Sequence, residues 1–181
     1  MKLKFISVLV VVLIAFTSCK DDKKAAPETK NVKENFSVEL DVIAEKSDDF
    51  TVYYTETGTN EFDGTKAAWR GVAGGNKLEK VVIDLPVEIT PTNIRLDFGI
   101  SPERKDVVLK NIKMIFYENS FEIKGSDFFN YFVKNDQIPT EVNAADGTIK
   151  FIKEASRKEG TYFYPRQELL DKIAKITKEV K

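Results

Sequence analysis

The stretch NIRLDFGISPERKDVVLKNIKMIFYE, residues 93–118, carries the clearest fold signal in this chain. Apolar residues alternate with polar ones from Ile94 to Phe98, which predicts a strand with one buried face. The chain then turns at Pro102, because proline lacks the backbone donor that a strand needs. Residues 107–118 carry the strongest strand signal of the sequence, being rich in aliphatic, β-branched and aromatic side chains.

The same signals recur on both sides of this stretch. Further strands are expected at Phe36–Ile43, Phe50–Glu56, Ala67–Ala73, Lys77–Leu85, Ser120–Gly125 and Thr148–Lys153. Turn residues separate them, including the glycine-bearing loop Glu56–Thr65 and the dipeptide Asp146-Gly147. Short, evenly spaced strands of this kind predict a mainly β fold, a jelly-roll-like β-sandwich over residues 36–164.

Two segments depart from the strand pattern. Ser126–Phe132 begins with a serine and an acid, which predicts a helical turn with Ser126 as its N-cap. Residues 165–181 predict a C-terminal amphipathic α-helix. Its apolar stripe consists of Leu169, Leu170, Ile173, Ile176 and Val180. The stripe could pack on the sandwich, lie on a membrane or meet a partner protein, and packing on its own domain is the commonest use.

The first residues have the character of a secretory leader. Met1–Lys4 is basic, and Phe5–Phe16 is an apolar run of 12 residues. A spanning helix needs about 20 apolar residues, so this run fits a signal peptide. The small residues before Cys19, the only cysteine, look like the lipobox that the bacterial lipoprotein signal peptidase cuts, although Phe16 departs from the usual leucine. The alternative is an incidental, buried thiol.

The lipobox implies that residues 1–18 are removed and that Cys19 receives fatty acyl groups such as palmitate. Two or more chains anchor a protein stably in a bilayer. Residues 20–35 are highly charged and almost free of large apolar side chains, which predicts a disordered tether. Lys20-Asp21-Asp22 also resembles the export signal of Bacteroidetes-type lipoproteins, which implies the outer membrane and the cell surface. A solvated charge run would look the same.

Composition excludes several classes of function. The 28 basic and 29 acidic residues nearly balance, which gives no reason to expect a nucleic-acid partner. The chain has no histidine and no thiol besides Cys19, so Ser-His-Asp and Cys-His catalytic groups and Cys/His zinc sites are ruled out. A structural calcium ion held by oxygen ligands remains open but has no motif behind it, and no cofactor is expected.

Residues Val52–Phe116 resemble the galactose-binding-like β-sandwich modules attached to bacterial cell-surface polysaccharide proteins. The resemblance rests on the Tyr53-Tyr54 pair, the acidic, glycine-bearing loop after it, and a strand that reads Ile-Arg-Leu-Asp. A proline turn then leads into the Val-x-Leu-Lys-x-Ile-x-x-Ile pattern from residue 107. The resemblance implies a non-catalytic module that binds sugar.

Sugar binding needs aromatic rings for the apolar face of a pyranose and polar groups for its hydroxyls. The candidates are Trp69, Arg70, Tyr53, Tyr54 and Phe62, with Glu61 and Asp63 in the adjacent loop. Several have a structural alternative. Trp69 is equally suited to a core, and Asp63 could cap its own turn. Tyr53 and Tyr54 are neighbours on a strand, so only one of them lines a given face.

The sequence therefore predicts a membrane-anchored, non-catalytic surface lipoprotein that binds polysaccharide. The main alternative is an accessory subunit of an outer-membrane complex, which would bind its protein partner through the C-terminal helix or a strand edge. Glycoside hydrolysis by Glu56, Glu61 and Asp63 is a weaker hypothesis, because 29 acids on one chain make neighbouring carboxylates common.

Lipidation is tested by intact-mass analysis of the protein from its native membrane. The product is expected to begin at Cys19 and to carry the mass of at least two acyl chains. Replacement Cys19→Ala removes the acceptor thiol and is expected to leave the leader attached. A native product with its leader in place and an unmodified thiol would contradict the anchor.

Overall fold

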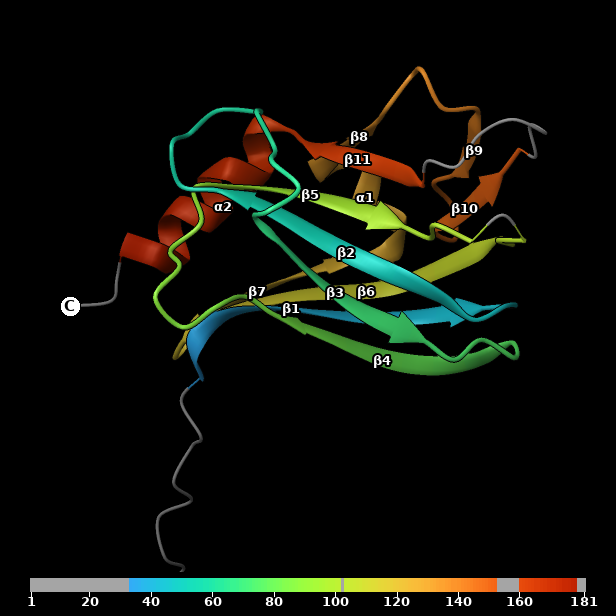
Figure 1. The fold of residues 1–181 in the computed structure, drawn as a ribbon, viewed down its shortest axis with the longest axis horizontal. Helices are drawn as coiled ribbons and strands as arrows, with labels where there is room; N and C mark the ends of the chain where they lie inside the picture. The colour runs from blue at the N-terminus through green and yellow to red at the C-terminus, as the bar shows by residue number, and fades with distance from the viewer. Residues whose placement is uncertain (1–32, 102, 153–159, 179–181) are drawn as a thin grey trace, which may run out of the picture. The chain divides into compact units, whose positions relative to one another are not determined.

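The structure is a computed structural model that describes residues 33–101, 103–152 and 160–178. The predicted leader, Cys19, Pro102, the end of the strand at Lys153 and Val180 lie outside these residues. The described part forms two antiparallel sheets that pack as a sandwich (Figure 1). The fold class predicted from the sequence is confirmed, since the chain is mainly β and carries a C-terminal helix.

The first sheet has six strands in the order β4-β1-β6-β10-β9, with β7 also paired to β6. It contains β1 (Lys33–Ala44), β4 (Lys77–Asp84), β6 (Val107–Tyr117), β7 (Asn119–Lys124), β9 (Thr140–Asn143) and β10 (Thr148–Phe151). The second sheet has five strands in the order β3-β2-β5-β11-β8. It contains β2 (Asp48–Thr55), β3 (Ala67–Val72), β5 (Asn93–Phe98), β8 (Phe132–Lys134) and β11 (Thr161–Pro165).

The chain passes between the sheets after β1, β3, β4, β5, β7, β8 and β10, which gives the sandwich its jelly-roll-like connections. Four strands differ from the sequence-based expectation. β9 and β11 were not predicted, and β8 begins at Phe132, where a helical turn was expected. β1 begins at Lys33, so the last residues of the predicted tether belong to the first sheet. Its pairing with β6 reaches back to Lys33 opposite Tyr117.

The two inner faces share one apolar core. Its largest fully buried aromatic side chains are Phe36, Phe50, Phe98, Phe128, Phe132 and Phe163. Phe98 on β5 lies at the centre, with ring centroids 5.1 Å from Phe50 and 5.7 Å from Phe163, both edge to face. Such pairs stabilise a core beyond their buried area by about 0.5–1.5 kcal/mol. Because side chains alternate along a strand, burial of Phe98 turns its neighbour Asp97 to the outer face.

The long strand β6 contains a β-bulge. Asp41 of β1 lies opposite Asn111, but the next residue of β1 lies opposite Leu109, so Lys110 is an extra residue. Both Leu109 and Ile112 are consequently buried, although they are three residues apart. At the bulge, the outer edge of β6 passes from β7 to β10, and the backbone N–H of Leu109 donates to the carbonyl oxygen of Gly147 at 3.0 Å.

The helices pack against the core of the sandwich. The helical turn expected near residue 126 is present as η1 (Gly125–Asp127) and α1 (Phe128–Tyr131), but Ser126 is not its cap, because no side chain caps either piece. The C-terminal helix is α2 (Gln167–Lys178). Its stripe residues Leu169, Ile173 and Ile176 are buried in the core, so the helix packs on its own domain as expected. None of the helices in the described residues is long and apolar enough to cross a membrane.

Gly125 packs closely against the backbone of β6 at the bulge, which predicts that a larger residue there destabilises the fold. A Cβ atom on Gly125 would lie 1.7 Å from the Leu109 carbonyl oxygen, so Gly125→Ala must displace backbone. We expect the free energy of unfolding to fall by at least about 2 kcal/mol in urea denaturation. Gly64→Ala is the matched control, because a Cβ atom there would have nothing within 4 Å, and its change should stay within about 0.5 kcal/mol. Equal stability of the two variants would refute the close approach.

Candidate functional site

The outer face of the five-stranded sheet carries a cluster of aromatic side chains around one ion pair. Strand register builds it, because Tyr53 of β2 lies opposite Arg95 of β5, and Tyr162 of β11 lies opposite Asp97. We call this cluster the aromatic platform. It consists of Tyr53, Phe62, Arg95, Asp97, Tyr162 and Tyr164. All six are half-buried, so one side of the cluster remains open to solvent.

Arg95 and Asp97 form a two-pronged ion pair at the centre of the platform. Arg95 donates from Nε to Asp97 Oδ1 and from Nη2 to Oδ2, each at 2.8 Å. Its guanidinium carbon lies 4.0 Å from the ring centroid of Tyr53 and 4.5 Å from that of Tyr162. A planar cation between two aromatic faces is attracted by both rings. The geometry fixes Arg95 in one orientation.

Burial and charge act on this pair in opposite directions. Burial raises the pKa of Asp97, and the hydrogen bonds and charge of Arg95 act to lower it without cancelling that rise. For Arg95, burial acts to lower the pKa, but the hydrogen bonds and charge of Asp97 outweigh it and raise the pKa. The side chains are only 16% and 12% exposed, so water shields them weakly. Asp97 consequently depends on Arg95 for its charged form.

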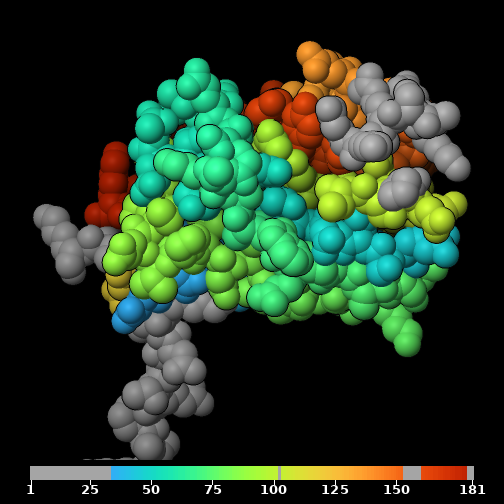
Figure 2. All heavy atoms as spheres, in the orientation of Figure 1, coloured from blue at the N-terminus to red at the C-terminus, as the bar shows by residue number. Residues whose placement is uncertain are grey.

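The loop between β2 and β3 is fixed to the sheet by hydrogen bonds. Asn93 donates from Nδ2 to the carbonyl oxygen of Thr59 at 3.0 Å and to Asn60 Oδ1 at 2.7 Å. The backbone N–H of Gly58 donates to Thr92 Oγ1 at 2.9 Å. These bonds hold the loop where Phe62 packs 6.0 Å from Tyr164, ring to ring. In Figure 2 the loop, coloured teal, projects from the surface of the molecule.

Trp69 lies on the same outer face, two strands from β5. It is opposite Thr51, which is opposite Asp97, which is opposite Tyr162. Three inter-strand steps of about 4.8 Å place Trp69 roughly 14 Å from Tyr162. The side chain is 69% exposed, which excludes the core position that the sequence left open. An exposed tryptophan beside the platform extends the aromatic surface toward the sheet edge.

Two predicted site residues have other roles. Tyr54 is only 6% exposed and points into the core, so the outward tyrosine of the pair is Tyr53. Tyr54 therefore cannot stack on an external ligand. Arg70 is exposed, but its Nε donates to the carbonyl oxygen of Val82 on β4 at 3.1 Å. That bond joins the edge strands of the two sheets, which is a structural role.

The predicted loop residues Glu61, Phe62 and Asp63 have different roles in the structure. Phe62 joins the platform. Asp63 caps its own turn, since its Oδ1 accepts the backbone N–H of Thr65 at 2.7 Å and the Thr65 hydroxyl at 2.8 Å. These bonds lower the pKa of Asp63, as expected of a structural acceptor. Glu61 is exposed, and its backbone N–H donates to Thr59 Oγ1.

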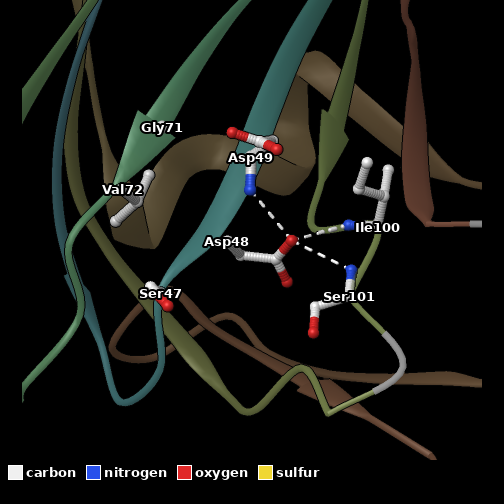
Figure 3. Close-up of a pocket in the computed structure, with 7 residues that line it drawn as sticks. All are labelled: Ser47, Asp48, Asp49, Gly71, Val72, Ile100 and Ser101. Carbon is white, nitrogen blue, oxygen red and sulfur yellow. Dashed lines mark hydrogen bonds between the residues drawn. The ribbon is translucent and has the colours of Figure 1, made fainter.

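A cavity of about 490 Å³ opens at the end of the sheet where β2 begins and β5 ends (Figure 3). It is lined by Ser47, Asp48, Asp49, Gly71, Val72, Ile100 and Ser101. Asp48 Oδ1 accepts the backbone N–H groups of Asp49 and Ile100 at 2.8 Å and of Ser101 at 3.0 Å. Asp49 lies opposite Gly71, two residues along from the pair of Thr51 and Trp69. Asp49 and Gly71 therefore share the outer face with the platform, whereas Asp48 and Val72 alternate to the inner side, so the cavity lies at the end of the sheet next to the platform.

The described residues include no group of three or more His, Cys, Asp or Glu side chains placed to hold a metal ion. Sequence reasoning named Tyr53 and Phe62 but missed four platform residues, namely Arg95, Asp97, Tyr162 and Tyr164. The sequence did contain a signal for these residues. Apolar and polar side chains alternate in Ile94–Phe98 and Thr161–Pro165, so in each segment the residues between the apolar ones share the outer face of a strand. Neither segment indicates that β11 pairs with β5, so the sequence did not predict that these side chains meet.

A scan of protein-family models found none that matches this chain, and searches of curated proteins and of solved structures found no match either.

The ion pair predicts a pH-dependent loss of stability in Arg95→Leu. Without the guanidinium, Asp97 is a buried carboxylate with no counter-charge, which should cost about 2–3 kcal/mol at pH 7. Its pKa in the folded variant rises further above the unfolded value. The folded variant then binds more protons than the unfolded chain, so its stability falls as the pH rises.

Urea denaturation at pH 4 and pH 7 measures this effect as the difference between wild type and variant. The loss should be smaller at pH 4, where protonated Asp97 needs no partner. The double variant Arg95→Leu with Asp97→Asn removes the titrating group and should abolish the pH dependence of the difference. A loss of the same size at both pH values in the single variant would show that Asp97 does not depend on Arg95.

Proposed function

We propose that this chain is a lipid-anchored, non-catalytic lipoprotein whose β-sandwich binds carbohydrate on the outer face of its five-stranded sheet. The observation that carries the proposal is the aromatic platform with the fixed Arg95–Asp97 pair at its centre. A surface that binds sugars needs accessible aromatic rings beside groups that bond hydroxyls, and the platform offers half-buried rings beside a guanidinium and a carboxylate. Trp69 enlarges the surface that a sugar chain can cover.

The exposure of Trp69 supports this assignment. A tryptophan that is 69% exposed leaves a large apolar side chain in water, where it contributes nothing to the core. The neighbouring strands add three tyrosines to the same face, Tyr53, Tyr162 and Tyr164. An exposed tryptophan gathered with half-buried tyrosines on one face is a feature of binding surfaces. A glycan that stacks on them would account for this arrangement.

The roles of the carboxylates favour binding over hydrolysis. Cleavage of a glycoside needs a protonated acid and a second carboxylate on opposite sides of the bond. Asp63 has a lowered pKa and holds its own turn. Asp97 has a raised pKa, but both its oxygens accept hydrogen bonds from Arg95, which leaves it poorly placed to give a proton to a substrate.

Anchoring remains part of the proposal through Cys19 and the charged segment after it, of which residues 20–32 lie outside the described part of the chain. An anchor at Cys19 would tie the sandwich to the outer membrane and present it to glycans at the cell surface. The accessory-subunit alternative gains no support from α2, because the apolar stripe that would bind a partner is buried in the domain's own core.

The test is a glycan array probed with the purified mature chain, residues 19–181, and with Trp69→Ala. Loss of the indole should weaken binding of any glycan that wild type retains by at least about tenfold, the cost of roughly 1–3 kcal/mol of stacking and burial. Leu78→Ala is the matched control, since Leu78 is 66% exposed on β4 of the other sheet. Absence of glycan binding, or equal effects of the two substitutions, would refute the proposal.

A further inference from the structure

The ligand class of the platform can be derived from its charges, and this inference rests on the proposed function. The platform contains one positively charged side chain, Arg95. Its charge is already balanced by the two hydrogen bonds that it makes to the Asp97 carboxylate. Two of the five guanidinium N–H groups make that bond, and the described residues provide no acceptor for Nη1. The remaining N–H donors can bond neutral oxygens. The positive charge of Arg95 is compensated by Asp97 and so does not attract an anionic ligand.

The border of the platform is acidic. Glu61 in the loop is exposed, and the Asp63 carboxylate is held ionised by its hydrogen bonds to Thr65. Lys66 faces Glu56 at 4.0 Å, so these two offset each other. A ligand that carries carboxylate or sulfate groups would meet repulsion here, because like charges raise the cost of association and slow the encounter.

The cavity at the other end of the face adds acceptors. Asp48 uses Oδ1 to bind three backbone N–H groups, and among the described residues nothing bonds to the Asp49 carboxylate. Arg104 lies nearby and keeps its positive charge, but its contacts are with the Ser101 carbonyl oxygen, 3.2 Å from Nη1, and with the Phe151 ring, 5.8 Å from the guanidinium carbon. The cavity therefore presents carboxylate oxygens with the hydroxyls of Ser47 and Ser101.

Hydroxyl groups are the partners that match this surface. A neutral sugar donates its hydroxyl protons to carboxylates and accepts from a guanidinium whose charge is already balanced. Its ring stacks on Trp69 or on the tyrosines without adding charge. We infer that the platform and the adjoining cavity bind a neutral polysaccharide and discriminate against polymers that carry carboxylates.

The experiment compares each polymer with its own oxidised form. Galactan, mannan and laminarin are used before and after chemical oxidation of their C6 hydroxymethyl groups to carboxylates, and binding to the mature chain is measured by titration calorimetry. For each polymer that binds, oxidation should weaken binding at least about tenfold at low salt. The difference should shrink in 0.5 M NaCl, because salt screens the repulsion.

Charge variants locate the discrimination on this face. Asp49→Asn with Glu61→Gln removes two acids without removing a hydrogen bond that the structure describes between them and other side chains, and should recover part of the binding lost on oxidation. Glu118→Gln with Glu122→Gln is the control for net charge, since both lie at or on β7 of the other sheet. It should leave the discrimination unchanged.

The outcomes separate the two proposals. If a native polymer and its oxidised form bind equally well, or the oxidised form binds more tightly, the neutral-ligand inference is wrong and the carbohydrate function stands. If neither form of any polymer binds and the glycan array is also blank, the carbohydrate function itself is contradicted. Equal recovery in the site and control variants would place the repulsion elsewhere on the molecule and overturn the assignment to this face.

Discussion

The alternation of side chains along β5 links the core to the candidate site. Its apolar residues fill the space between the sheets, and Phe98 among them contacts rings from β2 and β11. Once Phe98 faces inward, Arg95 and Asp97 must face outward together, because they are two residues apart. A shift of one residue in register would bury this ion pair and expose the aromatic core, so the site is held in place by the same packing that stabilises the fold.

In the six-stranded sheet the alternation of side chains is interrupted by the bulge in β6. In the five-stranded sheet the described pairs of β2, β5 and β11 alternate regularly. In β6 the extra residue Lys110 shifts the alternation by one position, so the buried side chains before and after it belong to different alternating sets. Glycines at positions 125 and 147 let the neighbouring backbone approach the Leu109 carbonyl oxygen. The bulge lets one strand pair with β7 along one part and with β10 along another. The described pairs of β2, β5 and β11 keep a continuous register, which brings side chains from three strands into one flat cluster.

The Arg95–Asp97 pair gives the platform its chemical character. Partial burial makes each charge dependent on the other, and the tyrosine rings on both sides restrict the guanidinium to the plane in which it bonds the carboxylate. The result is a rigid, nearly neutral group that still presents N–H donors within an aromatic surface. Rigid donors lose little entropy on binding, so such a surface suits weakly interacting ligands with many hydroxyl groups, which need an organised site to be recognised at all.

Local periodicity and turn residues were enough to predict the class of the fold, the places of most strands and the burial of the C-terminal helix. They also drew attention to Phe62, which packs in the platform, and to Trp69, which is exposed on the same face. The prediction for Tyr54 was wrong, because Tyr54 has the same parity along the strand as the apolar residues Phe50 and Val52 and therefore points inward. The position of Tyr162 beside Asp97, which is 65 residues away in the chain, follows only from the packed sheets. Pairing between distant strands depends on how all the apolar faces close around one core, and no local pattern encodes that closure.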